Sequence, residues 1–141
     1  MKYKAGLWID HRKCVVVLIK DNKIEKKIIN SSAEKHLRRI YGKSSTTSFE
    51  SQKVKADDKQ ERHFINLLNT YFDEIIFYIK DAEFILIFGP GEAKGELLKR
   101  INKKKINGQI KEVETTDKMT DSQIIGKVKE HLFKLGKKIK N

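Results

Sequence analysis

The sequence has very little cysteine and no long apolar run, and both absences exclude classes of protein. Cys14 is the only cysteine among 141 residues, so no disulfide can form within the chain, which suits a reducing compartment. Cys14 lies in an apolar segment, which favours an inert core thiol over a nucleophile. No apolar run approaches the roughly 18 residues of a membrane span, and no signal-peptide core is visible near the start. We therefore expect a cytoplasmic protein without membrane segments.

Acidic residues are also scarce relative to basic ones. Lys and Arg total 31 against 19 Asp and Glu, and the net charge is +12. A charge of this size concerns partners rather than fold, and it makes RNA the first candidate partner. An acidic protein is the next candidate, and a general enrichment in lysine explains the charge equally well. The apolar content of 38% allows one core, so we expect a single domain over residues 1–141.

The first part of the chain predicts an antiparallel meander of three strands. The expected strands are Ala5–Asp10, Cys14–Ile19 and Ile24–Ile29, and Asp21-Asn22 supplies turn chemistry. A polar segment follows, which we interpret as a mobile loop at about residues 30–57. Ser32 to Ile40 is compatible with a short helix capped by Ser32.

The remaining chain alternates between helical and strand patterns. Apolar residues at three- and four-residue steps predict a long amphipathic helix from Glu61. A strand over Phe84–Phe88, a helix from Gly91 to about Lys103 and a strand over Ile110–Glu114 are expected next, and a capping box at Thr120 to Gln123 opens a final helix. The order β-β-β-α-β-α-β-α, with right-handed crossovers, predicts an α/β fold with a five-stranded mixed sheet of order 3-2-1-4-5 and helices on its faces. This is the ribonuclease-H-like layout.

Several motifs together resemble a known family. "GLWIDHRKCVVV", "ADDKQERHF", "FGPGEAKGEL" and "VETTDKMTD" are similar to a bacterial family related to the archaeo-eukaryotic peptide-chain release factors, whose members are labelled release-factor-like, translational machinery or host-attachment proteins. The layout also resembles the middle domain of the release factor and of Pelota. The resemblance implies a translation-related ancestry and a ribosome or RNA partner, tRNA or rRNA. Release factors carry a catalytic Gly-Gly-Gln tripeptide before the long helix, and the corresponding segment here, Asn30 to Gln60, has none. The resemblance therefore carries over no hydrolytic activity.

A Gly-Pro-Gly turn between a strand and a helix is the first candidate site. Gly89, Gly91 and Lys94 form a possible anion site, because a helix N-terminus offers free N–H groups. Pro90 removes one donor and Glu92 can satisfy the helix end with its own charge. We therefore favour a tight structural turn over a phosphate cradle.

Asp10 is the second candidate, because ribonuclease-H-like nucleases bind a metal through an Asp on the first strand. No other acid has a motif spacing with Asp10, so a turn residue is the favoured interpretation. His36, His63 and His131 have no second ligand three or four residues away, so the sequence predicts no zinc site. No cofactor and no catalytic residue is predicted.

Basic residues are the third candidate, as contacts to RNA or the ribosome. Such contacts would go to phosphates and would be salt-dependent. The resulting hypothesis is a non-catalytic ribosome- or RNA-associated factor that uses a basic surface and the 30–60 loop. A metal-dependent nuclease or RNA-ester hydrolase is the alternative, and a protein-interaction factor is the second alternative. The predicted basic contacts are Arg38, Arg39, Lys43, Lys53, Lys55, Lys99, Arg100, Lys103, Lys104, Lys105, Lys137 and Lys138.

Overall fold

The computed structural model describes residues 3–21, 23–33 and 50–140, with the backbone alone for residues 50–60 and 135–140. The element order confirms the predicted β-β-β-α-β-α-β-α sequence. The elements are β1 (Lys4–Ile9), β2 (Lys13–Lys20), β3 (Lys23–Asn30), α2 (Glu50–Ile79), β4 (Phe84–Gly89), α3 (Ala93–Lys104), β5 (Gln109–Thr115) and α4 (Asp121–Lys140).

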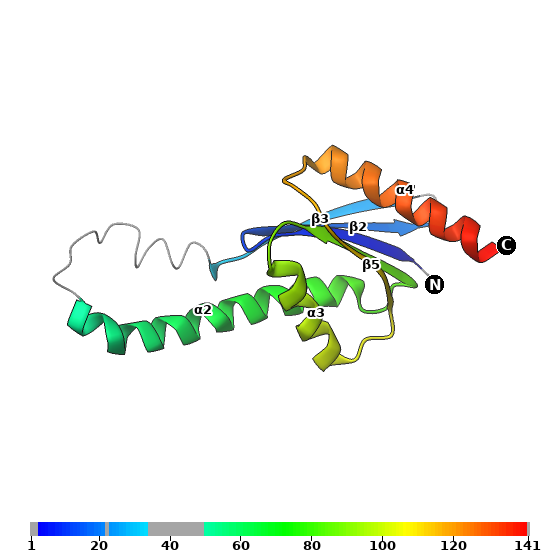
Figure 1. Ribbon diagram of the computed structural model, residues 1–141. Coiled ribbons are helices and arrows are strands. Elements are labelled where there is room, and N and C mark those ends of the chain that lie inside the picture. The colour runs from blue at the N-terminus through cyan, green and yellow to red at the C-terminus, as the bar shows by residue number, and fades with distance from the viewer. Residues whose placement is uncertain (1–2, 22, 34–49, 141) are drawn as a thin grey trace.

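The five strands form one mixed sheet in the order β3-β2-β1-β4-β5 (Figure 1). β1 pairs with β2 and β2 with β3 in antiparallel fashion, while β4 pairs in parallel with β1 and β5 in parallel with β4. This confirms the predicted strand order and the ribonuclease-H-like layout. Asp21, in the turn between β2 and β3, has the positive φ of 53° that the turn chemistry predicted.

Helices cover both faces of the sheet, so the sheet lies between two layers (Figure 1). α2 and α3 pack on one face against Leu7, Ile9 and Val16, among others. α4 packs on the opposite face against Trp8, Phe88 and their neighbours. Central strands covered on both sides must be apolar on both sides, which explains the continuous apolar sequence of β2.

Cys14 is a fully buried residue of the core layer beneath α2. Burial raises the pKa of its thiol well above the ordinary value, and the charge of Asp10 adds to the rise. Because the thiolate is the reactive form, this residue is the inert core thiol that its apolar sequence context predicted.

The start of α2 differs from the prediction, because the helix begins at Glu50 and not at Glu61. The predicted loop at about 30–57 is therefore wrong over residues 50–57. The apolar periodicity begins only at Phe64, so the polar first turns gave no amphipathic signal. Once a helix is nucleated by packing, each further residue adds one backbone hydrogen bond, and polar residues can extend it. Most of the short helix predicted over Ser32 to Ile40 cannot be compared, because the described residues stop at Ala33 and resume at Glu50. At the start of that segment, Ala33 N–H donates a hydrogen bond to Ser31 Oγ at 3.1 Å.

β5 contains a bulge that decides which way its side chains point. Ile85 pairs with Ile110, but the next residue, Leu86, pairs with Glu112. Ile110 packs in the layer under α2 and α3, whereas Leu86 belongs to the layer under α4. Without the extra residue, strand alternation would turn Glu112 to the side of Ile110. The bulge therefore directs Glu112 and Glu114 toward α4.

The first turn of α4 has the predicted capping box. Thr120 N–H donates to Gln123 Oε1 at 2.9 Å, and Gln123 N–H donates to Thr120 Oγ1 at 3.2 Å. Within the described part of the chain, no helix combines the length and apolar character that crossing a membrane requires.

Candidate functional site

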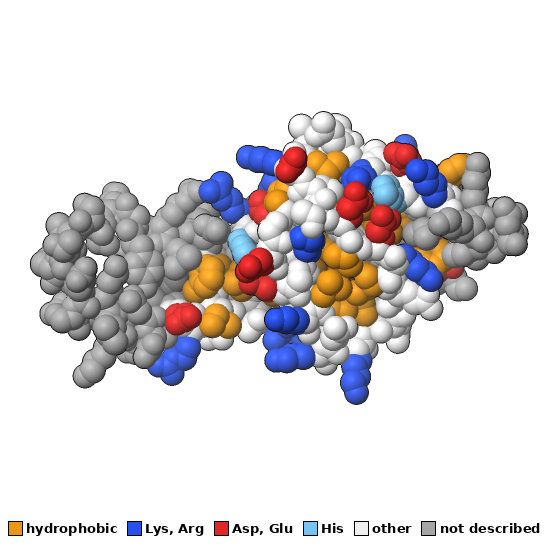
Figure 2. Space-filling view, in the orientation of Figure 1, with side chains coloured by type: hydrophobic (Ala, Val, Ile, Leu, Met, Phe, Trp, Pro, Cys, Tyr) orange, Lys and Arg blue, Asp and Glu red, His pale blue; other side chains and the backbone are white. Residues whose placement is uncertain are grey.

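A groove of about 330 Å³ lies between α2 and α3 and brings together three of the predicted basic residues. Its apolar wall comes from Ile65, Leu68 and Phe72 of α2. Lys99, Arg100 and Lys103 of α3, with Glu96 and Asn69, form the polar wall. We call this feature the α2–α3 groove. Figure 2 shows basic side chains beside hydrophobic ones over these two helices.

The three basic residues of the groove differ in how they are paired. Arg100 is held by Asp73 through two hydrogen bonds, Nε to Oδ1 at 2.8 Å and Nη2 to Oδ2 at 2.9 Å. This contact lowers the pKa of the Asp73 carboxyl and raises the pKa of Arg100. Lys99 and Lys103 are exposed, and among the described residues neither has an ion-pair partner. The groove therefore presents two ammonium groups available to a ligand and one guanidinium fixed in place.

Glu96 of the groove also has a partner, which comes from another part of the chain. His11, from the turn between β1 and β2, contacts Glu96 of α3, with His11 Nε2 and Glu96 Oε2 2.8 Å apart. The neighbouring Arg12 side chain is exposed. The β1–β2 turn thus lies beside α3, although the two segments are some eighty residues apart in the sequence.

The other predicted basic residues do not all join this groove. Lys104 reaches Asp73 at 3.7 Å, and Lys105 ends α3 with a left-handed φ of 51°. Lys137 and Lys138 belong to α4, which covers the opposite face of the sheet. Lys53 and Lys55 lie in the first turns of α2, described by their backbone only, and Arg38, Arg39 and Lys43 lie outside the described residues. The predicted set is thus divided between two faces.

The Gly-Pro-Gly turn joins β4 to α3 beside the C-terminal end of β1. Gly89 has a φ of 153°, and a Cβ there would lie 2.1 Å from the carbonyl oxygen of Ile9. Only a residue without a Cβ can lie so close to the neighbouring strand, so the close packing of the backbone explains why position 89 is a glycine. Gly91 also has a positive φ, 66°, and its carbonyl accepts a hydrogen bond from Lys94 Nζ at 2.6 Å. Glu92 is the N-cap residue and makes no side-chain capping hydrogen bond, so the expectation that its charge satisfies the helix end stays a prediction. Anion binding at this turn stays a prediction.

Asp10 has the geometry of a turn residue, as the favoured interpretation predicted. Its Oδ1 accepts the N–H groups of Arg12 at 2.7 Å and Lys13 at 2.8 Å. Its carbonyl oxygen accepts the hydroxyl of Tyr71 at 2.9 Å. Among the described residues, no cluster of potential metal ligands includes Asp10.

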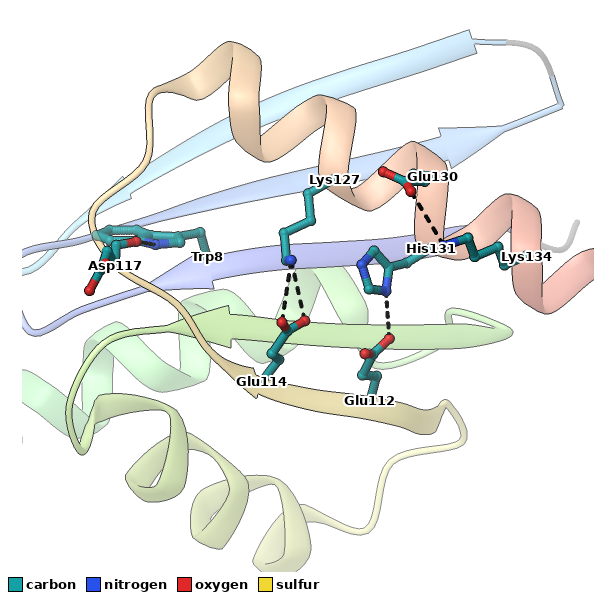
Figure 3. A network of polar contacts seen from close by, with 8 residues as sticks. All are labelled: Trp8, Glu112, Glu114, Asp117, Lys127, Glu130, His131 and Lys134. Atoms are coloured by element: carbon teal, nitrogen blue, oxygen red, sulfur yellow. Dashed lines mark hydrogen bonds and ion pairs between the residues drawn. The ribbon is translucent and has the colours of Figure 1, made fainter.

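One cluster of potential ligands does occur, and the sequence did not indicate it. Glu112 and Glu114 of β5 and His131 of α4 offer ligand atoms within 4.8 Å of one another (Figure 3). The sequence analysis searched for ligands three or four residues from each histidine, whereas these three come from a strand and from the helix packed above it. The alternation Glu112-Val113-Glu114 was a visible signal, but the bulge that turns it toward α4 was not.

Comparisons with known proteins concern the fold alone. No protein-family model matches the chain, and no curated protein matches its sequence. Among solved structures, the Thermoplasma acidophilum Pelota protein is 18% identical with a TM-score of 0.48, and the match covers 89% of this chain and 31% of Pelota. The archaeal translation termination factor aRF1 is 12% identical with a TM-score of 0.46, over 97% of this chain and 42% of that chain. The Aquifex aeolicus Ppx/GppA phosphatase is 18% identical with a TM-score of 0.35, over 82% of this chain and 36% of that chain. This chain thus spans less than half the length of each.

Proposed function

We propose that this protein is a non-catalytic RNA- or ribosome-associated factor that binds through the α2–α3 groove. The observation that carries the proposal is the pair Lys99 and Lys103, exposed one helical turn apart on α3 and without an ion-pair partner among the described residues. Side chains four residues apart lie on the same face of a helix. Two adjacent ammonium groups can contact successive phosphates of an RNA strand.

The apolar wall of the groove favours a single strand over a duplex. Ile65 is 46% exposed, while Leu68 and Phe72 are buried behind it. A ribose or base edge can contact Ile65 while its phosphate reaches Lys99 or Lys103. A rigid duplex would offer only its phosphate backbone to this wall. Single-stranded loops are the segments of RNA that proteins most often bind in this way.

The net charge of +12 supports the proposal by raising the rate of encounter with any polyanion. The resemblance of the sequence motifs to release-factor relatives supports the assignment to translation. The lack of Gly-Gly-Gln supports a role other than peptidyl-tRNA hydrolysis. The contribution predicted for residues 30–60 rests on the sequence, because residues 34–49 lie outside the described part.

The proposal is tested by sedimentation with purified ribosomes and by binding to a fluorescent single-stranded RNA, each at low and at high salt. We expect cosedimentation and RNA binding at low salt and release at high salt. The variant Lys99→Glu with Lys103→Glu should lose most of this binding.

A matched control separates a local site from a general charge effect. Lys118→Glu with Lys129→Glu makes the same change of net charge at two exposed positions, in the segment before α4 and on α4 itself. This control should keep most of the binding. Equal losses in the two double variants would overturn the groove as the site. A wild-type protein that stays at the top of the gradient at low salt and leaves the RNA free would overturn the function itself.

A further inference from the structure

Four polar side chains lie close together between β5 and α4, and none of them belongs to the α2–α3 groove proposed to bind RNA. Glu112 and Glu114 rise from the strand toward the helix, and Lys127 and His131 reach down from the helix toward them (Figure 3). Glu112 Oε2 lies 2.8 Å from His131 Nδ1. Lys127 Nζ lies 3.3 Å from Glu114 Oε2. We call Glu112, Glu114 and His131 the β5–α4 cluster.

From this geometry we infer that the β5–α4 cluster binds a divalent transition-metal cation such as Zn²⁺. Two carboxylate oxygens and one imidazole nitrogen form a donor set that suits such a cation. Three protein ligands leave at least one coordination position for water. The cluster lies on the α4 face of the sheet, opposite the α2–α3 groove, so the inference does not depend on the proposed RNA contact.

The distances require only side-chain adjustment. The three ligand atoms lie within 4.8 Å of one another. Bonds of about 2.0–2.1 Å in a tetrahedral site would separate them by about 3.3 Å. The last torsion of a Glu or His side chain has a broad energy profile, so small rotations can make up the difference. The backbone of β5 and α4 need not move.

The positions of the ligands are fixed by the fold. Glu112 pairs with Leu86 and Glu114 with Phe88 across the parallel ladder, so both stand over β5 at defined heights. The His131 ring packs edge-on against Phe88, with ring centroids 5.3 Å apart. The β5 bulge is what turns both carboxylates to this side. A set of ligands held by rigid elements is the arrangement that a metal site requires.

Glu114 has an atom that the protein leaves unsatisfied. Its Oε2 is buried and accepts no hydrogen bond, although Lys127 Nζ lies 3.3 Å away and donates a hydrogen bond to the other oxygen, Oε1, at 3.4 Å. A buried carboxylate oxygen without a hydrogen bond is costly, and a metal ion would satisfy it. Because Lys127 already forms an ion pair with this carboxylate, its ammonium group would compete with a bound cation.

This competition gives the inference a distinctive test with purified protein and Zn²⁺ in isothermal titration calorimetry, with Co²⁺ absorption as a second readout. We expect one Zn²⁺ per chain. Glu114→Gln and His131→Gln should each weaken binding about tenfold or more, because even the loss of a residue that only orients a ligand costs about tenfold or more. Lys127→Met should strengthen binding about tenfold, because it removes a positive charge next to the metal.

The control is Glu130→Gln. Glu130 precedes His131 in the sequence, but its carboxylate forms an ion pair with Lys134, with Oε1 and Nζ 3.3 Å apart, and does not belong to the β5–α4 cluster. This variant should bind Zn²⁺ like the wild type. Circular dichroism of each variant separates lost ligands from lost folding. Failure of the wild type to bind, equal binding by all variants, or an unchanged affinity in Lys127→Met would each overturn the site. In those cases the four side chains form only an ion pair, Lys127 with Glu114, beside a hydrogen bond between His131 and Glu112.

Discussion

Asp73 and Arg100 show how one pair of residues both fixes a side chain and sets a pH dependence. The two parallel hydrogen bonds between them join α2 to α3 and hold the guanidinium at the groove. Hydrogen bonding from Arg100 is the largest cause that lowers the pKa of Asp73. The Asp73 side chain is 37% exposed, so solvent screens the pair and limits its contribution to stability.

Asp73→Asn should lower the free energy of unfolding by about 0.5–1 kcal/mol at neutral pH. Because the pKa of the folded Asp73 is depressed, the stabilisation is present above the unfolded pKa of about 3.9 and is lost as the pH falls through the folded value. The difference between wild type and variant should therefore shrink as the pH is lowered below about 4. Urea unfolding over this range measures it.

Glu74→Gln is the control for this measurement, since Glu74 is exposed and adjacent in the sequence. It should change stability little at either pH. A difference for Asp73→Asn that stays constant from neutral to acid pH would contradict the assigned role of the pair.

Single residues also show where sequence reasoning succeeds and where it stops. Asp10 was predicted as a turn residue because its chemistry acts on backbone groups two and three residues away. The role of Arg100 was predicted only as a positive charge, because its partner Asp73 lies on another helix. His131 was set aside for lack of nearby ligands, and its neighbours are assembled by the sheet. Local chemistry is visible in the sequence, while contacts between elements are not.

For secondary-structure elements too, features set by local sequence were predictable and features set by contacts between elements were not. Strand order and the placing of the three described helices between and after the strands were predictable, because turn chemistry, apolar periodicity and the handedness of crossovers restrict the topology. The start of α2 was missed because its first turns are polar and carry no periodic signal. The β5 bulge was missed because no local residue type marks it, and it alone decides on which face Glu112 and Glu114 lie.

The capping box of α4 supports a prediction at this scale. Thr120→Ala should lower the free energy of unfolding by about 1 kcal/mol, because the Gln123 N–H loses its acceptor at the exposed helix start. Chemical denaturation followed by circular dichroism measures the change. Ser122→Ala, at an exposed position two residues further along, should have almost no effect. Equal effects of the two substitutions would show that helix propensity, and not the cap, is responsible.

The whole molecule is a sheet between two helical layers, and this separates the two proposed sites. The α2–α3 groove lies on one face and the β5–α4 cluster on the other. The chain carries its excess positive charge on both faces, because α3 and α4 are both rich in lysine. Overall charge therefore raises affinity for RNA without telling where the RNA binds. A measurement that counts the phosphate contacts made by particular lysines is needed to separate binding at one site from the effect of overall charge.

The salt dependence of RNA binding supplies that count. Each phosphate contact to a single strand adds about 0.7 to the slope of log affinity against log salt concentration. Lys99→Gln with Lys103→Gln should therefore make the slope shallower by about 1.4, measured by fluorescence anisotropy between about 50 and 200 mM salt. Lys118→Gln with Lys129→Gln removes the same charge elsewhere and should leave the slope unchanged, although affinity at low salt falls slightly. A slope that changes alike in both double variants would mean that the RNA contacts the whole basic surface, and the α2–α3 groove would then have no special role.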